Sequence, residues 1–580
     1  MDLGHLYREL KQRRVLRVTG LYLVGAWALV QVSDTVFPLL GWPERAVRWV
    51  LIGAIAGLPI SILISWFFDL TPEGLQRTGD TVAPAAVADQ PRRPASIRSR
   101  AAGFVGLGIL IALASFAALS RYSGGRAPHI SSVAVLPFVD LSAEHNQQYF
   151  TDGVTEEIMS RLAQVGLRVA ARTSSFAFQG QNLEIDEIAR RLNVGAVLEG
   201  SIRREGDSVR ITVKLIDART EAVIWGSSFD RGVAGIFAIQ DEIADAIVGA
   251  LKLKLAPETA RSADGRTRNV AAQELYFKGL KAWHDGTDPQ LRTALQFFEQ
   301  ASGADPTYAL AYAGIAKTYA VLPTFGDFSI FDALTKGKEA AARATALVPN
   351  LGEAYAALGQ IAQNLEWDLP TALNNYRNAL RVAPNDATSH QWYAEALMMT
   401  GDLATAATET SRALELDPLS PPAKNLRAYQ ALLRGDYAAA TRLYQILLRE
   451  HPSFAFGKLN SALAALATRE YADAANALVS ALPQFGPDVG VYVAAISDAD
   501  DRAAAARIVA AMEQSQRPSV TALLYAAIGE KGKALELLER AYRTASDATL
   551  PYWLLHPLLD PLRQEPRFQE VARGVGIVRK

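Results

Sequence analysis

The sequence contains no cysteine, and this absence removes several kinds of chemistry. Disulfides, thiol nucleophiles and cysteine-ligated zinc or iron–sulfur centres are all excluded. The compartment stays open, because a chain without thiols is equally safe in oxidising and reducing surroundings. The seven histidines are scattered without the spacing of metal ligands, so no bound metal is predicted.

An excess of charge of one sign is also missing. The chain has 59 basic and 60 acidic residues, a net charge of −1. A nucleic-acid-binding protein would show a basic surplus, so no nucleic-acid partner is predicted. No glycine-rich run ends in Gly-Lys-Ser or Gly-Lys-Thr, which removes the usual nucleotide-binding loop. No cofactor is therefore predicted.

Few residues suggest catalysis. Asp152, Glu156 and Glu157 resemble paired carboxylates, but a helix that begins at Asp152 or Thr155 explains them more simply, because acids suit its positive end. Ser174 and Ser175 have no histidine nearby in the sequence. We therefore predict no catalytic residue and no enzymatic activity.

Long hydrophobic runs, in contrast, are concentrated near the amino terminus. Segments 18–40 and 47–68, within region 1–69, and segment 101–119, within region 101–120, are nearly free of charge. Each has about 19 to 23 residues, enough for a helix to cross a bilayer core of roughly 30 Å. Residues 70–100, rich in proline, alanine and arginine, are predicted to form a flexible linker.

Basic residues predict the orientation of these segments. They gather before the first segment and in the linker before the third, which places both regions in the cytoplasm of a bacterium. Three crossings then put the rest of the chain in the periplasm. A cleaved signal or a re-entrant hairpin is an alternative for the first segments, and two crossings instead of three would return the rest to the cytoplasm.

Residues 131–255 have the pattern of an α/β domain with a mixed sheet. The predicted strands are 133–138, 167–178, 196–203, 209–217 and 222–229, and the predicted helices are 155–165, 185–192 and 236–255. A Gly-Asp turn at 206–207 separates two alternating runs, which indicates a hairpin.

Several strings of this domain resemble a known family. Ser132–Phe138, Tyr149–Glu157, Val169–Phe176, Val197–Arg203 and Phe237–Ile243 are similar to the TolB-like amino-terminal domain of bacterial membrane-bound repeat proteins. The segments Tyr7–Val18 and Phe67–Gly74 resemble the membrane region of the same proteins. The resemblance implies no catalytic activity. Relatives often join this domain to a cyclase or a winged-helix transcription domain, for which residues 1–100 are too short and too apolar.

The carboxyl-terminal half carries a repeat. A proline returns about every 34 residues, which matches the tetratricopeptide repeat, a stack of helical hairpins. These prolines are Pro306, Pro349, Pro384, Pro418 and Pro452. Small residues recur where two helices must approach closely, as at Ala372 and Ala379. Residues 270–570 are predicted to form an all-α solenoid of six or seven units, with an insertion around 322–334 and a terminal cap around 551–568.

Such a stack presents an extended concave surface to another polypeptide. Five aromatic residues are candidates to line its groove: Tyr308, Tyr312, Tyr319, Trp392 and Tyr393. The sequence thus predicts a membrane-anchored scaffold or sensor of the bacterial inner membrane that binds a protein or peptide. The alternative is the regulatory half of a signalling system whose output module lies on another chain.

Overall fold

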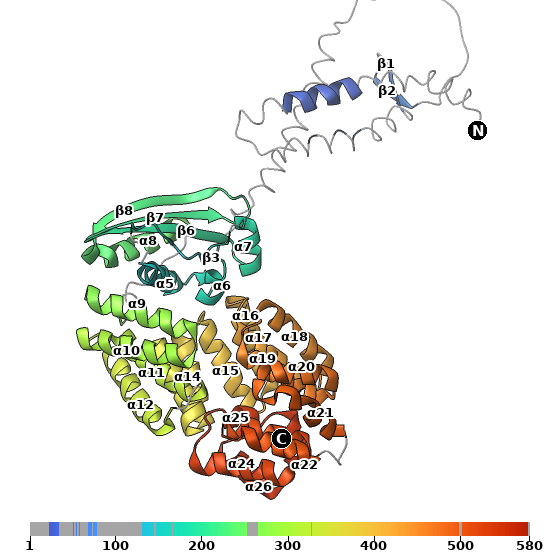
Figure 1. The fold of residues 1–580 in the computed structure, drawn as a ribbon. Coiled ribbons are helices and arrows are strands. Elements are labelled where there is room, and N and C mark those ends of the chain that lie inside the picture. Colours follow the sequence, from blue (N-terminus) through green and yellow to red (C-terminus); the bar gives the residue numbers. More distant parts are fainter. Residues whose placement is uncertain are drawn as a thin grey trace, which may run out of the picture. The chain divides into compact units, whose positions relative to one another are not determined.

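The computed structural model describes most of the chain beyond residue 130 and short parts before it. The described residues are 22–33, 50, 54, 57, 68–71, 74–77, 130–143, 147–164, 166–181, 183–251, 265–325, 328–497, 502–514 and 516–577. They belong to two compact units, Met1–Ser123 and Gly124–Lys580 (Figure 1).

In the first unit, residues 22–33 are helical and two short strands form a hairpin. Strands β1 (Phe68–Thr71) and β2 (Gly74–Arg77) are antiparallel, so the predicted linker 70–100 starts in a hairpin. The predicted spans 18–40 and 47–68 fall largely, and 101–119 wholly, outside the described residues. Among the residues that are described, no helix combines the length and the apolar character needed to cross a bilayer.

The second unit begins with a mixed sheet, as the sequence predicts. In spatial order it contains β5 (Arg168–Val169), β3 (Ser132–Val135), β6 (Ala196–Glu205), β7 (Ser208–Asp217) and β8 (Val223–Gly232), and β4 (Val139–Asp140) also pairs with β6. Strands β5, β3, β4 and β6 are parallel, and β6, β7 and β8 are antiparallel. The predicted turn joins β6 to β7, with Gly206 at a positive φ of 57°.

Helices cover both faces of this sheet. On one face, α5 (Gln148–Gln164) and α8 (Ile236–Ala250) bury the side chains of Val133, Val135 and Leu198. On the other, α7 (Ile185–Leu192) packs against Ala134 and Val197, which alternate with the first set along their strands. The domain therefore has three layers (Figure 1).

The predicted strand 167–178 is wrong beyond its start. Only Arg168–Val169 is a strand, and α6 (Arg172–Phe176) follows. The backbone N–H of Ala171 leaves the sheet and donates to the carbonyl of Leu416, 3.0 Å away in the helical region. That contact ends the strand, because the same N–H cannot also serve the sheet.

The rest of the unit is an array of helical pairs. Pairs 1 to 8, in order, are α9 (Val270–Asp285) with α10 (Asp288–Ala304), α11 (Ala309–Phe325) with α12 (Ile330–Leu347), α13 (Gly352–Ile361) with α14 (Leu369–Val382), α15 (Ala387–Met399) with α16 (Leu403–Leu416), α17 (Pro421–Leu433) with α18 (Tyr437–Glu450), α19 (Ala455–Thr468) with α20 (Tyr471–Ala481), α21 (Val489–Ser497) with α22 (Arg502–Met512), and α23 (Pro518–Ala527) with α24 (Lys531–Thr544). Shorter elements are η1 (Val233–Gly235), η3 (Ala362–Glu366), η4 (Pro483–Asp488), α25 (Leu550–Trp553), η6 (Pro557–Leu562) and α26 (Pro566–Gly574).

The repeat prolines lie where the sequence predicts. Each of the five stands between the second helix of one pair and the first helix of the next. The predicted small residues, such as Ala372, Ala379 and Ala406, are fully buried. The insertion near 322–334 lengthens α11 and α12. Pair 7 was not predicted as a unit of its own, and its two helices, of 9 and 11 residues, are shorter than those of most other pairs.

Candidate protein-interaction groove

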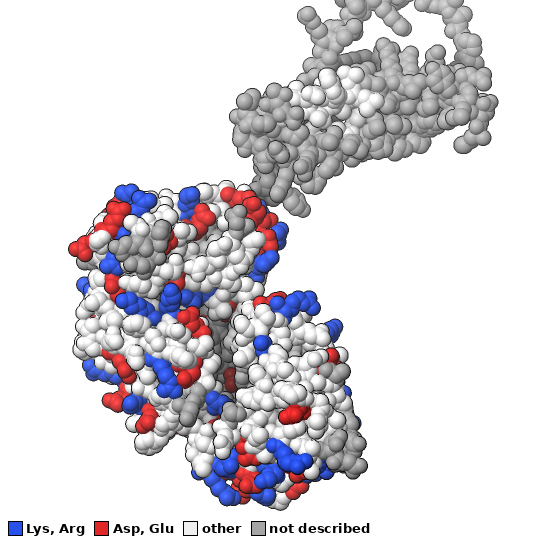
Figure 2. Space-filling model, in the orientation of Figure 1, with Lys and Arg blue, Asp and Glu red and all other residues white. Residues whose placement is uncertain are grey.

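The inner wall of the array is made by the first helix of each pair. Helices α9, α11, α13, α15, α17 and α19 contact one another in succession. In a stack of helical hairpins this inner surface is the concave one. Figure 2 shows a deep hollow below the α/β domain, between the early and the later pairs. The hollow is the natural place for a bound polypeptide.

The five aromatic residues predicted to line the groove lie mainly in the packing between helices. Tyr308, Tyr319 and Trp392 are buried, whereas Tyr312 and Tyr393 are half-buried. The ring of Tyr308 lies 5.1 Å from that of Tyr276, and the hydroxyl of Tyr393 accepts a hydrogen bond from Arg377. A ligand contact by Tyr312 or Tyr393 stays a prediction.

The inner wall of pairs 1 to 3 instead presents residues that sequence reasoning missed. A small hollow of about 30 Å³ is lined by Leu280, Trp283, Lys317 and Glu353, among others. The Lys317 ammonium lies 3.5 Å from the centre of the Trp283 ring, a cation–π contact. Burial lowers the pKa of Lys317 and raises the pKa of Glu353. Trp283 and Lys317 lie about 34 residues apart, so the repeat period itself was a signal for them.

A polar network forms the wall at pairs 3 and 4. Asn364 donates to Gln360 over 2.5 Å, Gln363 donates to Asn364 over 3.2 Å, and the Tyr376 hydroxyl donates to Gln363 over 3.0 Å. Glu395 lies beside this network, and burial raises its pKa to about 7. Perturbed titratable groups of this kind tend to gather at functional sites.

The groove at pairs 5 and 6 is filled by the chain itself. Tyr552 of α25 stacks on Tyr429 with ring centres 4.5 Å apart, and its hydroxyl donates to Asn460 over 3.1 Å. Phe456 also packs on Tyr552 and Trp553. Tyr429, Phe456 and Asn460 belong to first helices, α17 and α19, so α25 lies on the inner wall. The predicted cap thus does more than cover the last pair.

The end of the chain also reaches back to pair 3. The rings of Trp367 and Tyr542 stack 5.8 Å apart, and Gly576 lies against Trp367 and Leu369. These contacts brace the later pairs against the earlier ones. Among the described residues, the contacts of α25 fall mainly on pairs 5 and 6, so the inner wall of pairs 1 to 4 is the more open part, with Tyr552 and Ala548 at its edge.

The α/β domain docks directly on pair 1. The rings of Phe150 and Phe277 meet edge to face at 6.3 Å, and Arg204 forms an ion pair of 2.6 Å with Glu274. Gly153 is needed at this contact, because a Cβ there would come within about 2.1 Å of the Phe277 ring. Part of the string Tyr149–Glu157, which resembles the TolB-like domain, thus lies at the docking contact.

Glu156 carries the electrostatic part of the docking. It contacts Nε2 of His284 at 3.1 Å and Nε of Arg172 at 3.2 Å. Burial alone would raise the pKa of Glu156, but His284, Arg172 and Lys317 together lower it to about 2. Burial lowers the pKa of His284, and the adjacent Glu156 carboxylate opposes this shift. Through Lys317, this cluster is electrostatically linked to the groove.

The prediction that these acids begin a helix is wrong. Helix α5 starts at Gln148, so Asp152, Thr155, Glu156 and Glu157 lie in its interior. Asp152 accepts from Gln148, and Thr155 accepts from the backbone of Phe138. Glu157 pairs with Arg266 over 2.5 Å. These residues serve packing and docking.

A second contact joins the α/β domain to the turn between pairs 4 and 5. Ser174 bonds Asp417, and its hydroxyl accepts from the backbone N–H of Leu419 over 2.8 Å. Leu419 packs against the small cluster that contains Ala134 and Phe178. The α/β domain therefore bridges from pair 1 to pair 4, across the open part of the groove (Figure 1).

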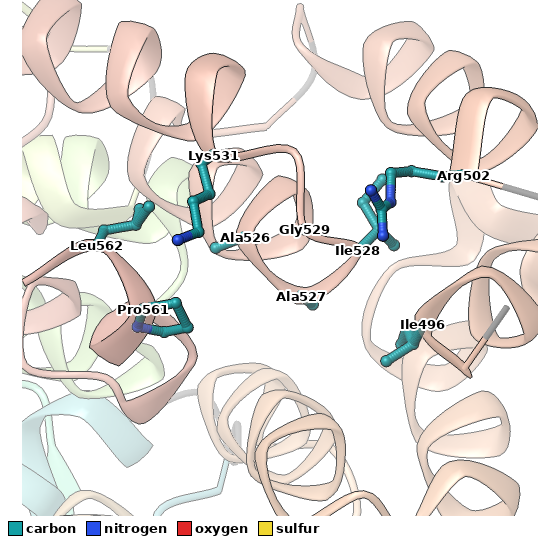
Figure 3. A pocket seen from close by; sticks show the side chains of 9 residues that line it. All are labelled: Ile496, Arg502, Ala526, Ala527, Ile528, Gly529, Lys531, Pro561 and Leu562. Carbon is teal, nitrogen blue, oxygen red and sulfur yellow. The ribbon is translucent and has the colours of Figure 1, made fainter. Parts of the chain in front are cut away.

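One further cavity lies far along the array. It has about 160 Å³ and is lined by residues of α21, α22, α23, α24 and η6 (Figure 3). Its charged lining residues are Arg502 and Lys531, which Figure 3 shows on opposite sides of the turn at Gly529. None of its lining residues belongs to pairs 1 to 4.

Two parts of the chain match known families. Residues 129–246 match the family described as HilA/YgeH-like transcriptional regulator, second domain, and residues 366–428 match the tetratricopeptide repeat. Both matches fall on units that the sequence predicts, an α/β domain followed by helical repeats. A TolB-like identity for the first of them remains a prediction.

Among solved structures, a tetratricopeptide protein of Thermus thermophilus is 24% identical, with a TM-score of 0.28, over 34% of this chain and all of that one. The superposition is too loose to transfer the position of any residue.

Curated relatives are similar over part of their length. A Rhizobium meliloti (strain 1021) protein that carries the name of an adenylate cyclase is 38% identical over 192 residues, 33% of this chain and 32% of its own. The transcriptional regulator HilA of Salmonella typhimurium is 27% identical over 151 residues, 26% of this chain and 27% of its own. The chain thus spans about a third of the length of these relatives, and its α/β domain is similar to a domain of transcriptional regulators.

Proposed function

We propose that this chain is a regulatory protein that senses a protein partner through the open groove of pairs 1 to 4. Binding there would be passed to the α/β domain. The proposal rests on the junction between the groove and the α/β domain. There, Glu156 of the α/β domain contacts His284 of pair 1 and lies within electrostatic reach of Lys317 in the groove. A ligand that engages Lys317 would change the field at the docking contact.

The similarity to a HilA-like regulator domain and to a protein named as a cyclase supports a signalling role over a passive scaffold. In this proposal the chain binds and catalyses nothing itself. Its output would come from a separate protein. The TolB-like character of the α/β domain, suggested by the strings quoted above, belongs to the same proposal.

The proposal includes an anchor in the bacterial inner membrane, with the α/β domain and repeats in the periplasm. Its support is the three apolar segments and their basic flanks. In the helix of residues 22–33, Val24 and Trp27 are about two-thirds exposed, as on a lipid-facing helix. A reporter active only in the periplasm, fused after Lys580, should be active. Activity of a reporter that works only in the cytoplasm would contradict the orientation.

Deletion and complementation in the host bacterium test the function. Deletion should change transcript or cyclic-nucleotide levels, and the wild-type chain should restore them. A groove variant, Trp283→Ala with Lys317→Glu, should fail to restore them, although it is produced and folded. Lys338→Gln is the control, because Lys338 lies on α12, the second helix of pair 2, and its exposed side chain pairs with Glu366. A passive scaffold predicts no transcript or nucleotide change on deletion.

A further inference from the structure

The mixed sheet of the α/β domain has one long free edge. Among the described residues, the ten-residue strand β8 pairs only with β7, and it is the outermost strand in Figure 1. The opposite edge strand, β5, has two residues, and the N–H of Ala171 that follows it is bonded to Leu416. Proline and lysine often protect a long edge from further pairing, and β8 contains neither. This edge is therefore open to another strand.

The ladder between β7 and β8 identifies the backbone groups that point outward. The N–H of Val233, directly after β8, donates to the carbonyl of Asp207, so these two residues face each other. In an antiparallel ladder, residues that bond the neighbour alternate with residues whose backbone groups point away from it. Along β8, the groups of Gly226 and Ser228 therefore point to the free edge. Neither residue makes a backbone hydrogen bond to a described residue on that side.

This free edge is limited at both ends. Toward the amino end, the register with β7 skips Ile224, which forms a bulge. Toward the carboxyl end, the guanidinium of Arg231 donates to the carbonyl of Asp230 over 2.9 Å and so occupies an outward-pointing group. The regular stretch between these limits is Trp225–Phe229, and its middle residue is Ser227.

The stretch is complementary to a second copy of itself. A twofold axis perpendicular to the sheet at Ser227 makes the two copies of β8 antiparallel, with equivalent faces on the same side. Gly226 of each copy then faces Ser228 of the other, and each such pair exchanges two backbone hydrogen bonds between outward-pointing groups. Trp225 lies opposite Phe229 of the other copy, an aromatic pair of the kind that stabilises neighbouring strands.

The two faces of the strand agree with this pairing. Trp225 and Phe229 are half-buried against the main core on the face that α8 covers, with ring centres 6.4 Å apart. Ser228 and Asp230 lie on the exposed polar face. In the antiparallel pair, each face adjoins the equivalent face of the other copy. Asp230 and Arg231 lie outside the paired stretch, so no like charges oppose each other across the axis.

We propose that two copies of this chain associate through β8, antiparallel and centred on Ser227, so that their mixed sheets become one continuous sheet. A second copy is the partner that fits, because the free stretch is bounded at both ends and its aromatic residues stand symmetrically about its centre. The association uses no residue of the groove, so it is independent of the proposed function.

The absence of cysteine provides a direct test. Ser227→Cys introduces the only thiol of the chain. In the proposed dimer the two thiols lie in a pair that is not hydrogen-bonded, with Cα atoms about 4.5 Å apart, which suits a disulfide. The full chain in detergent is oxidised with copper phenanthroline and run on a non-reducing gel. A disulfide-linked dimer is the expected product.

Ser228→Cys is the matched control, because it is the next residue and its side chain is more exposed. In the proposed register its two copies are displaced by two residues along the strands, which separates their Cα atoms by more than about 7 Å, too far for a disulfide. Its dimer should therefore form at least about tenfold more slowly than that of Ser227→Cys. Random collision would instead favour the more exposed thiol.

Gly226→Pro tests the backbone pairing itself. Proline lacks the N–H that points to the free edge and leaves the bonds to β7 in place, as edge strands tolerate. An added Cβ at Gly226 has room, since its nearest neighbour would lie 3.5 Å away. Combined with Ser227→Cys, this change should abolish the disulfide-linked dimer. Unchanged hydrogen exchange in β7 would show that the sheet remains folded.

The contrary outcomes are specific. Absence of a linked dimer in both cysteine variants overturns the inference, and so does oxidation of Ser228→Cys as fast as or faster than that of Ser227→Cys. Survival of the linked dimer with Gly226→Pro overturns it as well, because the two copies would then meet through another surface.

Discussion

At the scale of single residues, the docking contact depends on one glycine. Gly153 faces the ring of Phe277, and a methyl group there would overlap it. Gly153→Ala is expected to destabilise the α/β domain on pair 1 by about 1–3 kcal/mol, the usual effect of overpacking. Denaturant unfolding monitored by tryptophan fluorescence measures the change.

The control for this change is Gly249→Ala in α8, where nothing lies within 4 Å of the added methyl group. There the substitution should leave stability unchanged or raise it by up to about 1 kcal/mol, because alanine favours the helix. Equal effects of the two substitutions would contradict the packing explanation.

The raised pKa of the single residue Glu395 predicts that the stability of the folded chain depends on pH. Its pKa of about 7 in the folded chain lies above the ordinary 4.5, so the folded state holds a proton that the unfolded state releases. Its contribution to stability is therefore complete below about pH 4.5 and is lost as pH rises toward 7, by at most about 3 kcal/mol. Glu395→Gln should flatten the profile between about pH 5 and 8 relative to wild type.

Chemical denaturation of both chains at half-unit steps of pH measures that difference. Glu339→Gln serves as the reference, because its side chain is exposed on α12. A Glu395→Gln profile parallel to that of the wild type would show that the carboxyl titrates normally.

At the scale of elements, the short helix α25 holds the later pairs together from inside. Tyr552 is 4% exposed and contacts α17 and α19, which lie about a hundred residues earlier in the chain. Tyr552→Ala should cost about 3–5 kcal/mol, as for other large aromatic residues removed from a core. Tyr552→Phe should cost about 1 kcal/mol, because only its hydrogen bonds are lost.

Hydrogen exchange locates the effect. Tyr552→Ala should increase exchange in α17 and α19 and leave the α/β domain unchanged. Tyr437→Ala, at a tyrosine 43% exposed on α18, is the control and should change little. Unchanged protection of α17 and α19 would mean that α25 is only a cover for the last pair.

The elements also show what local sequence can and cannot predict. Helix α7 was predicted with its full range because both ends are encoded locally: Asp186 and Glu187 stand in its first turn, and Asn193 takes the left-handed conformation that ends it. The strand predicted over 167–178 failed because Ala171 and Ser174 bond residues about 245 positions away. Such contacts leave no local pattern.

The groove, too, was predictable from the sequence only in part. Repeat prolines and small residues encode the pairs, so the inner wall was predictable in kind. Which side chains face it was not, because the aromatic residues chosen from the sequence, such as Tyr308 and Trp392, are used for packing. Lys317, Glu353 and Glu395 gain their character from burial among distant neighbours. The position of α25 on the inner wall was not predictable either, because it depends on contacts with α17 and α19, about a hundred residues earlier in the chain.

At the scale of the second unit, the α/β domain and the array should behave as one cooperative body. The ion pair between Arg204 and Glu274 joins them, with both side chains about one-fifth exposed. Arg204→Glu and Glu274→Arg should each weaken the docking, because like charges then face each other. The double variant should restore it, with a coupling energy of about 1–2 kcal/mol, larger than for an exposed pair.

Hydrogen exchange of α5 and α9 reports docking directly, since both helices lose protection when the domain separates. Arg210 and Asp230 provide the matched control, an ion pair of 2.7 Å between β7 and β8 that is more than half exposed. Reversal of that pair should leave α5 and α9 protected, because it lies within one domain. Loss of protection in both single variants with recovery in the swap would identify the junction as the element through which groove and α/β domain communicate. If hydrogen exchange in α5 does not change together with exchange in α9 in these variants, the α/β domain and the helical array act separately. A ligand in the groove would then have no route to the α/β domain.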